Sequence, residues 1–129
     1  MKWLPYRKLE VWRRSFALAM EVVDVAEEGP LARRFYYRDQ LCDAAMSVPA
    51  NIAEGNGRST PLDYASFLDR ARASLFELDT WLQGARDKGW IDPAAHDRWL
   101  SELFELSAML NSLASKIRAT GALPSRSRT

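Results

Sequence analysis

The sequence contains very few of the side chains from which reactive or metal-binding sites are usually built. Its 129 residues include one cysteine, Cys42, and one histidine, His96. A single cysteine excludes an internal disulfide framework and a zinc site made of several thiolates. The di-metal sites of helical bundles use Glu-x-x-His on two helices, a pattern that this sequence lacks. We therefore predict a protein without a metal, a cofactor or a catalytic constellation, and hence not an enzyme.

The two scarce residues have ordinary structural interpretations. Cys42 has no obvious histidine partner in the sequence, so a thiol packed in the interior is the preferred interpretation. His96 stands near the start of an expected helix, and we predict that it lies in a solvated first turn. The segment GNGR at 55–58 follows a helix instead of a strand and lacks the lysine of a phosphate-binding loop.

Long apolar runs are also absent. No segment approaches the roughly 20 apolar residues that cross a bilayer, and the start MKWLPYRKLEVWRR lacks the apolar core of a signal peptide. With the single cysteine, this predicts a cytoplasmic protein that does not enter a membrane. The formal net charge is only +1, so the overall charge favours neither a nucleic-acid nor a membrane partner.

What the sequence does contain is a helical period of apolar residues in four successive segments. Apolar residues recur at steps of three and four, as they do on one face of a helix. In the first segment the expected core positions are Leu9, Trp12, Phe16, Ala19, Val23 and Ala26. We predict helices at about 6–28, 32–55, 61–88 and 93–119, in one domain spanning 1–120, followed by a disordered basic tail at 121–129.

The boundaries between these segments carry stop and start signals for helices. Gly29 and Pro30 end the first helix, and Thr60 and Asp92 each provide a capping side chain before a proline. The connections are only a few residues long, which places consecutive helices side by side and antiparallel. We therefore predict an all-α protein, an antiparallel up-and-down four-helix bundle.

The first and third helices carry more apolar residues than one buried stripe requires. A monomer would leave part of this surface in water, and ordinary monomers expose apolar patches of only a few hundred Å². We predict a homo-oligomer that uses these residues, with a closed ring as one solution. The alternative is that they cover neighbouring helices inside the bundle. The residues concerned are Leu4, Val11, Leu18, Val22, Val25, Phe67, Phe76 and Trp81.

The segment SVPANIAEG, which begins at Ser47, places a proline inside the second helix. Pro49 has no N–H for the carbonyl of Ala45, so the helix must kink there or break and restart. If the period continues, Asn51 falls on the core stripe, where its amide needs partners. Asn51 and Glu54 either hold a tightly packed helix end through hydrogen bonds or face a partner, and the sequence leaves both interpretations open.

The longer run QLCDAAMSVPANIAEGNGR resembles the signature of the four-helix-bundle proteins encoded in bacterial 23S rRNA intervening sequences. The similarity extends to LEVWRRSFALA and to FLDRARASLFELDTWLQGARDKGWI. The resemblance implies a bundle that assembles into a ring, a homopentamer. Related accessory proteins of diversity-generating retroelements imply binding of nucleic acid and a reverse transcriptase. The signature residues, to which the resemblance gives a structural role, are Ser47, Pro49, Asn51, Ile52, Ala53, Glu54 and Gly55.

The sequence departs from the pattern of these proteins beside the signature. Cys42 and Asp43 stand where relatives commonly have a pair of arginines. This difference removes two candidate phosphate contacts and adds an acidic group, which weakens the case for RNA binding through that face.

Basic residues elsewhere remain candidates for phosphate binding. Arginine can hold a phosphate through two hydrogen bonds, and patches repeated around a ring would add. The alternative is that these residues form solvated helix faces with ordinary ion pairs such as that of Glu10 with Arg14. The candidates are Arg7, Lys8, Arg13, Arg14, Arg33, Arg34, Arg38 and Arg58.

These observations predict a non-enzymatic, homo-oligomeric binding or scaffold protein. Its leading partners are further copies of itself and RNA or a ribonucleoprotein, including a reverse transcriptase, held through the summed basic patches. The alternative is a structural assembly protein or protein-protein adaptor that binds no nucleic acid, with exposed aromatic residues such as Phe76 and Trp81 as its docking surface.

Overall fold

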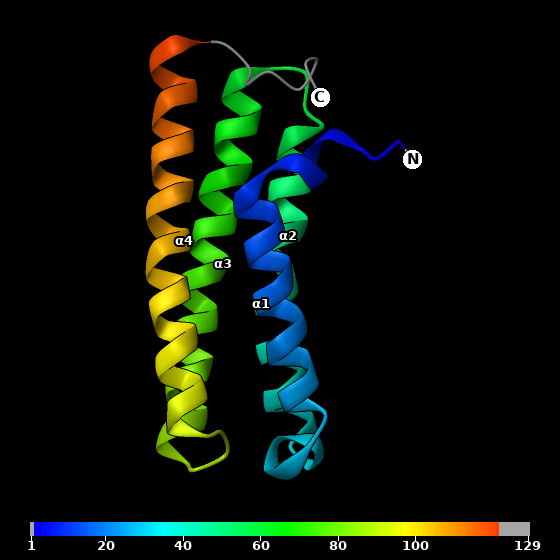
Figure 1. The fold of residues 1–129 in the computed structure, drawn as a ribbon, viewed down its shortest axis with the longest axis vertical. Helices are drawn as coiled ribbons and strands as arrows, with labels where there is room; N and C mark the ends of the chain where they lie inside the picture. Colours follow the sequence, from blue (N-terminus) through cyan, green and yellow to red (C-terminus); the bar gives the residue numbers. More distant parts are fainter. Residues whose placement is uncertain (1, 122–129) are drawn as a thin grey trace.

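The computed structural model describes residues 2–121, and these form four long α-helices and two short 3-10 helices (Figure 1). Apart from Gly121, the expected basic tail at 121–129 lies outside the described residues. No helix within 2–121 combines the length and the apolar character that crossing a membrane requires. In chain order the elements are η1 (Pro5–Lys8), α1 (Glu10–Ala26), η2 (Gly29–Arg33), α2 (Phe35–Asn56), α3 (Pro61–Asp87) and α4 (Pro93–Thr120).

The helices pack in the order of the sequence. Contacts join α1 to α2, α2 to α3 and α3 to α4, and the contact between α2 and α3 is the most extensive. Between α1 and α4 the contact is sparse. Figure 1 shows each helix running opposite to the one before it, with α1 beside α2 and α3 beside α4. The fold is therefore an up-and-down four-helix bundle, as predicted, whose α1–α4 side is loosely closed.

The first two helices begin later than predicted. Helix α1 begins at Glu10 because Pro5–Lys8 form a separate 3-10 turn, whose Lys8 carbonyl accepts a hydrogen bond from Arg13 Nη1 at 2.6 Å. Helix α2 begins at Phe35 because the expected start lies within η2. Gly29, with φ of 61°, turns the chain into η2 in a conformation that glycine adopts readily.

The start signals of the third and fourth helices are confirmed. Thr60 Oγ1 accepts a hydrogen bond from the backbone N–H of Asp63 at 3.2 Å, and an Asp92 carboxylate oxygen accepts one from Ala94 at 3.3 Å. Each bond satisfies a backbone donor that has no partner inside the helix.

The apolar stripe of α1 that faces the core agrees only in part with the predicted one, of which Ala19 and Ala26 are buried. Val11, Leu18 and Val22 are buried inside the bundle, whereas Phe16 is 37% exposed and Trp12 is half-buried. The buried stripe also contains Ser15, so its small and aliphatic side chains allow α1 to lie close to its neighbours. The rings of Trp12 and Phe16 lie beside the buried stripe and stack on each other, with centroids 5.0 Å apart.

This arrangement corrects the predicted oligomer surface. Val11, Leu18, Val22 and Phe67 belong to the interior of one chain and do not form a free face. Val25 and Trp81 are half-buried against the core, while Leu4 and Phe76 are exposed.

Pro49 is buried within a continuous α2, so the helix does not break and restart there. The Asn51 amide nitrogen donates hydrogen bonds to the backbone oxygen of Ser47 at 2.8 Å and to its hydroxyl at 2.9 Å. The same hydroxyl lies 2.8 Å from that of Ser74 on α3. The polar signature residues thus support the helix around the proline and link α2 to α3.

Gly55 lies at a close approach of α2 and α3. A Cβ atom at Gly55 would lie 2.6 Å from Cβ of Phe67 and 3.2 Å from the backbone oxygen of Tyr64. Real Cβ atoms do not tolerate such a contact, so the helices would have to move apart. The last residue of the signature is therefore a packing requirement of the fold.

We expect Gly55→Ala to lower the free energy of unfolding by about 1–3 kcal/mol, because the added methyl group overpacks the α2–α3 contact. Chemical denaturation followed by circular dichroism measures this difference. Gly57→Ala is the matched control, because a Cβ there has no neighbour closer than 3.5 Å. Equal effects of the two substitutions would contradict the explanation.

Candidate functional site

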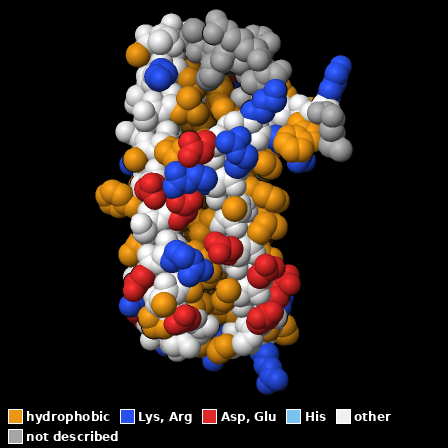
Figure 2. Space-filling model, viewed as in Figure 1, with side chains coloured by type: hydrophobic (Ala, Val, Ile, Leu, Met, Phe, Trp, Pro, Cys, Tyr) orange, Lys and Arg blue, Asp and Glu red, His pale blue; other side chains and the backbone are white. Residues whose placement is uncertain are grey.

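Charged residues are unevenly distributed along the bundle axis. The end formed by residues 2–13, 50–70 and 112–121, here called the basic end, has eight Lys and Arg and four Asp and Glu. The opposite end, formed by residues 20–43 and 79–98 and called the acidic end, has six Lys and Arg and ten Asp and Glu. The face drawn in Figure 2 has several acidic side chains over the lower ends of the helices. A nearly neutral chain therefore has two oppositely charged ends.

The structure separates the predicted phosphate-binding residues into two groups. Arg7, Lys8 and Arg13 lie together at the start of α1, at the basic end. Arg33 and Arg34 are also exposed, but they lie beside the start of α2 at the acidic end. Among the described residues, no carboxylate lies within ion-pair distance of any of these five side chains.

The other three predicted residues are already paired within the chain. Arg38 lies 3.2 Å from Asp39 and donates to the backbone oxygen of Ala32 at 3.0 Å. Arg58 pairs with Glu54 at 3.1 Å, one turn earlier in α2. Arg14 is held by several carboxylates, as described below. A phosphate would have to compete with these partners, so the three residues are weaker candidates than the five unpaired ones.

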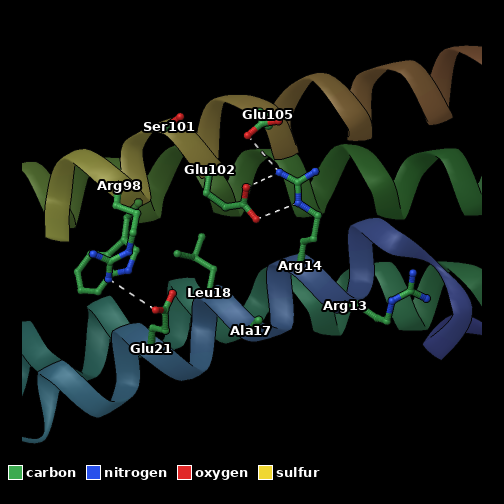
Figure 3. A pocket seen from close by; sticks show the side chains of 10 residues that line it. Arg13, Arg14, Ala17, Leu18, Glu21, Arg98, Ser101, Glu102 and Glu105 are labelled. Carbon is green, nitrogen blue, oxygen red and sulfur yellow. Dashed lines mark hydrogen bonds and ion pairs between the residues drawn. The ribbon is translucent and has the colours of Figure 1, made fainter.

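A groove of about 730 Å³ separates α1 from α4 on the loosely closed side of the bundle. Figure 3 shows charged side chains from both helices along this groove, with Leu18 and Ala17 on the α1 side. Arg98 reaches across to Glu21, with a nitrogen–oxygen distance of 3.6 Å. The buried ring of Trp99 also lines the groove.

Arg14 crosses from α1 to two glutamates of α4 (Figure 3). Its Nε donates to Glu102 at 3.0 Å, its Nη2 contacts the other oxygen of Glu102, and Glu105 lies 3.2 Å away. The hydrogen bonding to Glu102 raises the pKa of Arg14 further above its ordinary value, although partial burial acts in the opposite direction. Sequence analysis paired Arg14 only with Glu10, because no local spacing indicates a partner 88 residues away.

The signature residues lie away from the grooves that the structure describes. Asn51 makes its hydrogen bonds inside α2, and Ile52 and Gly55 are buried. Glu54 is exposed on the outside of α2 and pairs with Arg58. None of the signature residues lines the α1–α4 groove or the groove between α3 and α4. Their contacts support the packing interpretation of the signature.

The single histidine and the single cysteine differ in their burial and in their contacts. His96 is only 1% exposed, so the prediction that it lies in a solvated first turn is wrong. Its Nδ1 lies 2.9 Å from a guanidinium nitrogen of Arg86. The same nitrogen of Arg86 pairs with Asp97 at 2.5 Å. Cys42 is half-buried, and burial raises the pKa of its thiol. Within residues 2–121, no three His, Cys, Asp or Glu side chains are grouped so that they could hold a metal ion.

The family model described as 23S rRNA-intervening sequence protein matches residues 7–112. The chain belongs to this family. The signature around Pro49 thus lies in the matched part, together with three complete helices and most of α4.

A solved structure supports the fold of this chain. The similar structure is a protein from Bacteroides thetaiotaomicron, described as having unknown function and belonging to the S23 ribosomal protein family. It is 19% identical, the similarity covers 81% of this chain and 97% of the other, and the TM-score is 0.73. No curated protein matches the chain.

We expect the Arg14–Glu102 pair to show a coupling energy of up to about 1 kcal/mol in a double-mutant cycle, falling as salt is added, because both side chains are only partly exposed. The cycle uses Arg14→Met and Glu102→Gln, with unfolding free energies as the readout. The more exposed pair of Arg98 and Glu21, cycled with the same substitutions, should give a value near zero. A coupling energy no larger than that of this control would show that Arg14 does not tie α1 to α4.

Proposed function

We propose that this family member is a non-enzymatic, self-associating binding module that holds RNA at its basic end. The observation that carries the proposal is the separation of charge along the bundle. With a net charge of +1, the molecule as a whole attracts a polyanion only weakly. An end with eight basic and four acidic residues provides a local field that attracts phosphate groups.

The start of the chain supplies the groups that such a site needs. Arg7, Lys8 and Arg13 carry no carboxylate partners among the described residues, so they can contact phosphates without breaking an ion pair. Trp3, which precedes them in the sequence, is exposed, and the guanidinium of Arg7 lies 5.6 Å from the centre of the Trp12 ring. Exposed aromatic rings among basic groups stack on unpaired bases, which favours RNA with single-stranded regions.

Self-association strengthens this proposal. The resemblance of the signature to ring-forming proteins implies a homopentamer, and five copies whose basic ends share one side would present their charge to the same RNA. Several weak phosphate contacts on one assembly act together and raise the overall affinity. A ribonucleoprotein, such as one that contains a reverse transcriptase, is the larger partner that this arrangement suits.

A protein-protein adaptor that binds no RNA is the second candidate. The observation that favours it is the exposure of Phe76 on α3 and of Phe104 on α4, because exposed aromatic rings are common at the centres of protein interfaces. On this alternative the charged ends would only keep the protein soluble and orient it toward its protein partner.

We expect labelled RNA that contains a hairpin and a single-stranded region to bind, with an affinity that falls steeply with salt. In the double variant Arg7→Gln with Lys8→Gln, the logarithm of the affinity should fall less steeply with the logarithm of the salt concentration. The magnitude of the slope should decrease by about 1.4–1.8 for each bound chain, because two phosphate contacts are lost. Fluorescence anisotropy across a salt series measures both quantities.

The matched control is Arg33→Gln with Arg34→Gln, which removes the same charge from the acidic end and should leave the affinity nearly unchanged. Equal weakening by the two double variants would show that RNA binding does not depend on the basic end. No binding at low salt would reject the RNA proposal and favour the adaptor.

A further inference from the structure

The loosely closed α1–α4 side holds a second cavity, which shares no lining residue with the groove around Arg14. This cavity, here called the apolar groove, has a volume of about 480 Å³ and lies between the start of α1 and the latter half of α4. Small-molecule sites in proteins have volumes of roughly 300–1,000 Å³. The apolar groove is therefore large enough for a ligand of low molecular mass.

The lining of the apolar groove is mainly hydrophobic. Val11 is only 4% exposed, and the partly buried side chains of Leu9, Met109 and Leu113 pack against the core. Residues 106–115 of α4 contain no Asp, Glu, Lys or Arg, although 27% of the chain is charged. Figure 2 shows hydrophobic side chains between the upper parts of α1 and α4. Covering such a surface with an apolar group removes it from water, which is favourable.

The apolar groove follows the direction of the helices. Ala108, Ser112 and Lys116 line it and are four residues apart, so they lie on one face of α4. At 1.5 Å per residue, the stripe from Ala108 to Lys116 is about 12 Å long. Arg14 borders this stripe, because its Nη1 lies 3.6 Å from the sulfur of Met109. An extended alkyl chain fits this narrow, bounded shape better than a broad ring system does.

The two charged residues of the lining differ in their ion pairing. Glu10 lies 3.6 Å from a guanidinium nitrogen of Arg14, so its charge is partly balanced within the chain. Lys116 is exposed, and within residues 2–121 no carboxylate lies within ion-pair distance of it. It belongs to the basic end, where the local field attracts anions. A free cation at one end of an apolar stripe favours a ligand with an apolar body and an anionic head.

We propose that the apolar groove binds a single-chain anionic amphiphile, a carboxylate with an unbranched alkyl chain. The alkyl chain lies along residues 108–113 between α1 and α4. Lys116 holds the carboxylate, and the hydroxyl of Ser112, one turn earlier, is a second donor. This site uses neither Arg7 nor Lys8, so it does not depend on the proposed RNA site.

The experiment follows the methionine methyl groups of the full chain by NMR while decanoate is added below its micelle concentration. Met109 lines the apolar groove, whereas Met20 on α1 and Met46 on α2 do not. Only the Met109 signal, assigned with the variant Met109→Leu, should shift and saturate. The affinity should rise from hexanoate to decanoate by up to about fourfold for each methylene, and should level off when the chain exceeds the stripe.

Lys116→Gln tests the charged head of the ligand. It should weaken the binding of octanoate about twofold to fivefold and leave that of octanol unchanged, because only octanoate forms an exposed ion pair. Lys88→Gln is the matched control, because it removes the same charge from an exposed position at the acidic end. Ser112→Phe fills the groove from an exposed position and should abolish the Met109 shift. Circular dichroism confirms that the variants fold.

Several outcomes would overturn the inference. They are a Met109 signal without a saturable shift, equal shifts of Met20 and Met46, and binding of octyltrimethylammonium as tight as that of octanoate. A smaller oligomer mass of Ser112→Phe in light scattering would also overturn it, because it would assign the groove to a contact between copies.

RNA titrations on the same proteins separate this inference from the proposed function. A chain that binds decanoate at Met109 but binds no RNA would keep the amphiphile site and reject the RNA site. RNA binding without a Met109 shift on addition of decanoate would keep the RNA site and reject the amphiphile site.

Discussion

The close approach of α2 and α3 is the constraint on which the rest of the fold depends. It requires glycine at position 55, where a Cβ would overlap with Phe67, and it places the hydroxyl groups of Ser47 and Ser74 against each other. Asn51 extends this polar link along α2 next to Pro49, which lacks the N–H of an ordinary helix residue. The family signature is thus explained by packing: its residues bring two helices together around a proline, and no described groove opens onto them.

Helix α1 is held less firmly, and this difference creates the surfaces that other molecules can reach. It packs on α2 through small and aliphatic residues, but its contact with α4 is sparse and includes the ion pair of Arg14 with Glu102. Long charged side chains can span a gap that apolar packing does not close. The aromatic residues Trp12 and Phe16 are left at the outer edge of α1, while Phe76 and Phe104 remain uncovered on the opposite pair of helices.

The separation of charge follows from the topology and from the order of charged residues. In an up-and-down bundle the start of α1 shares an end with the start of α3 and the end of α4, so segments distant in sequence combine their charges. Arg7 and Lys8 thus lie at the same end as Lys116 and Arg118, whereas the acidic loop after α1 lies at the other end with the acidic residues around Asp92. Charges that cancel over the whole chain do not cancel locally, and electrostatic attraction acts over about 10 Å at moderate salt.

The sequence by itself determined the helices, their order and their up-and-down arrangement, because apolar periodicity, capping residues such as Thr60 and Asp92, and short connections are local properties. It also identified the signature around Pro49. Only the tertiary structure decided which residues of the two apolar stripes of α1 are buried, since both stripes have helical spacing and the choice depends on the shapes of the neighbouring helices. It likewise decided that Arg14 pairs with Glu102 and that His96 is buried, because these contacts join residues on different helices and no local pattern specifies them.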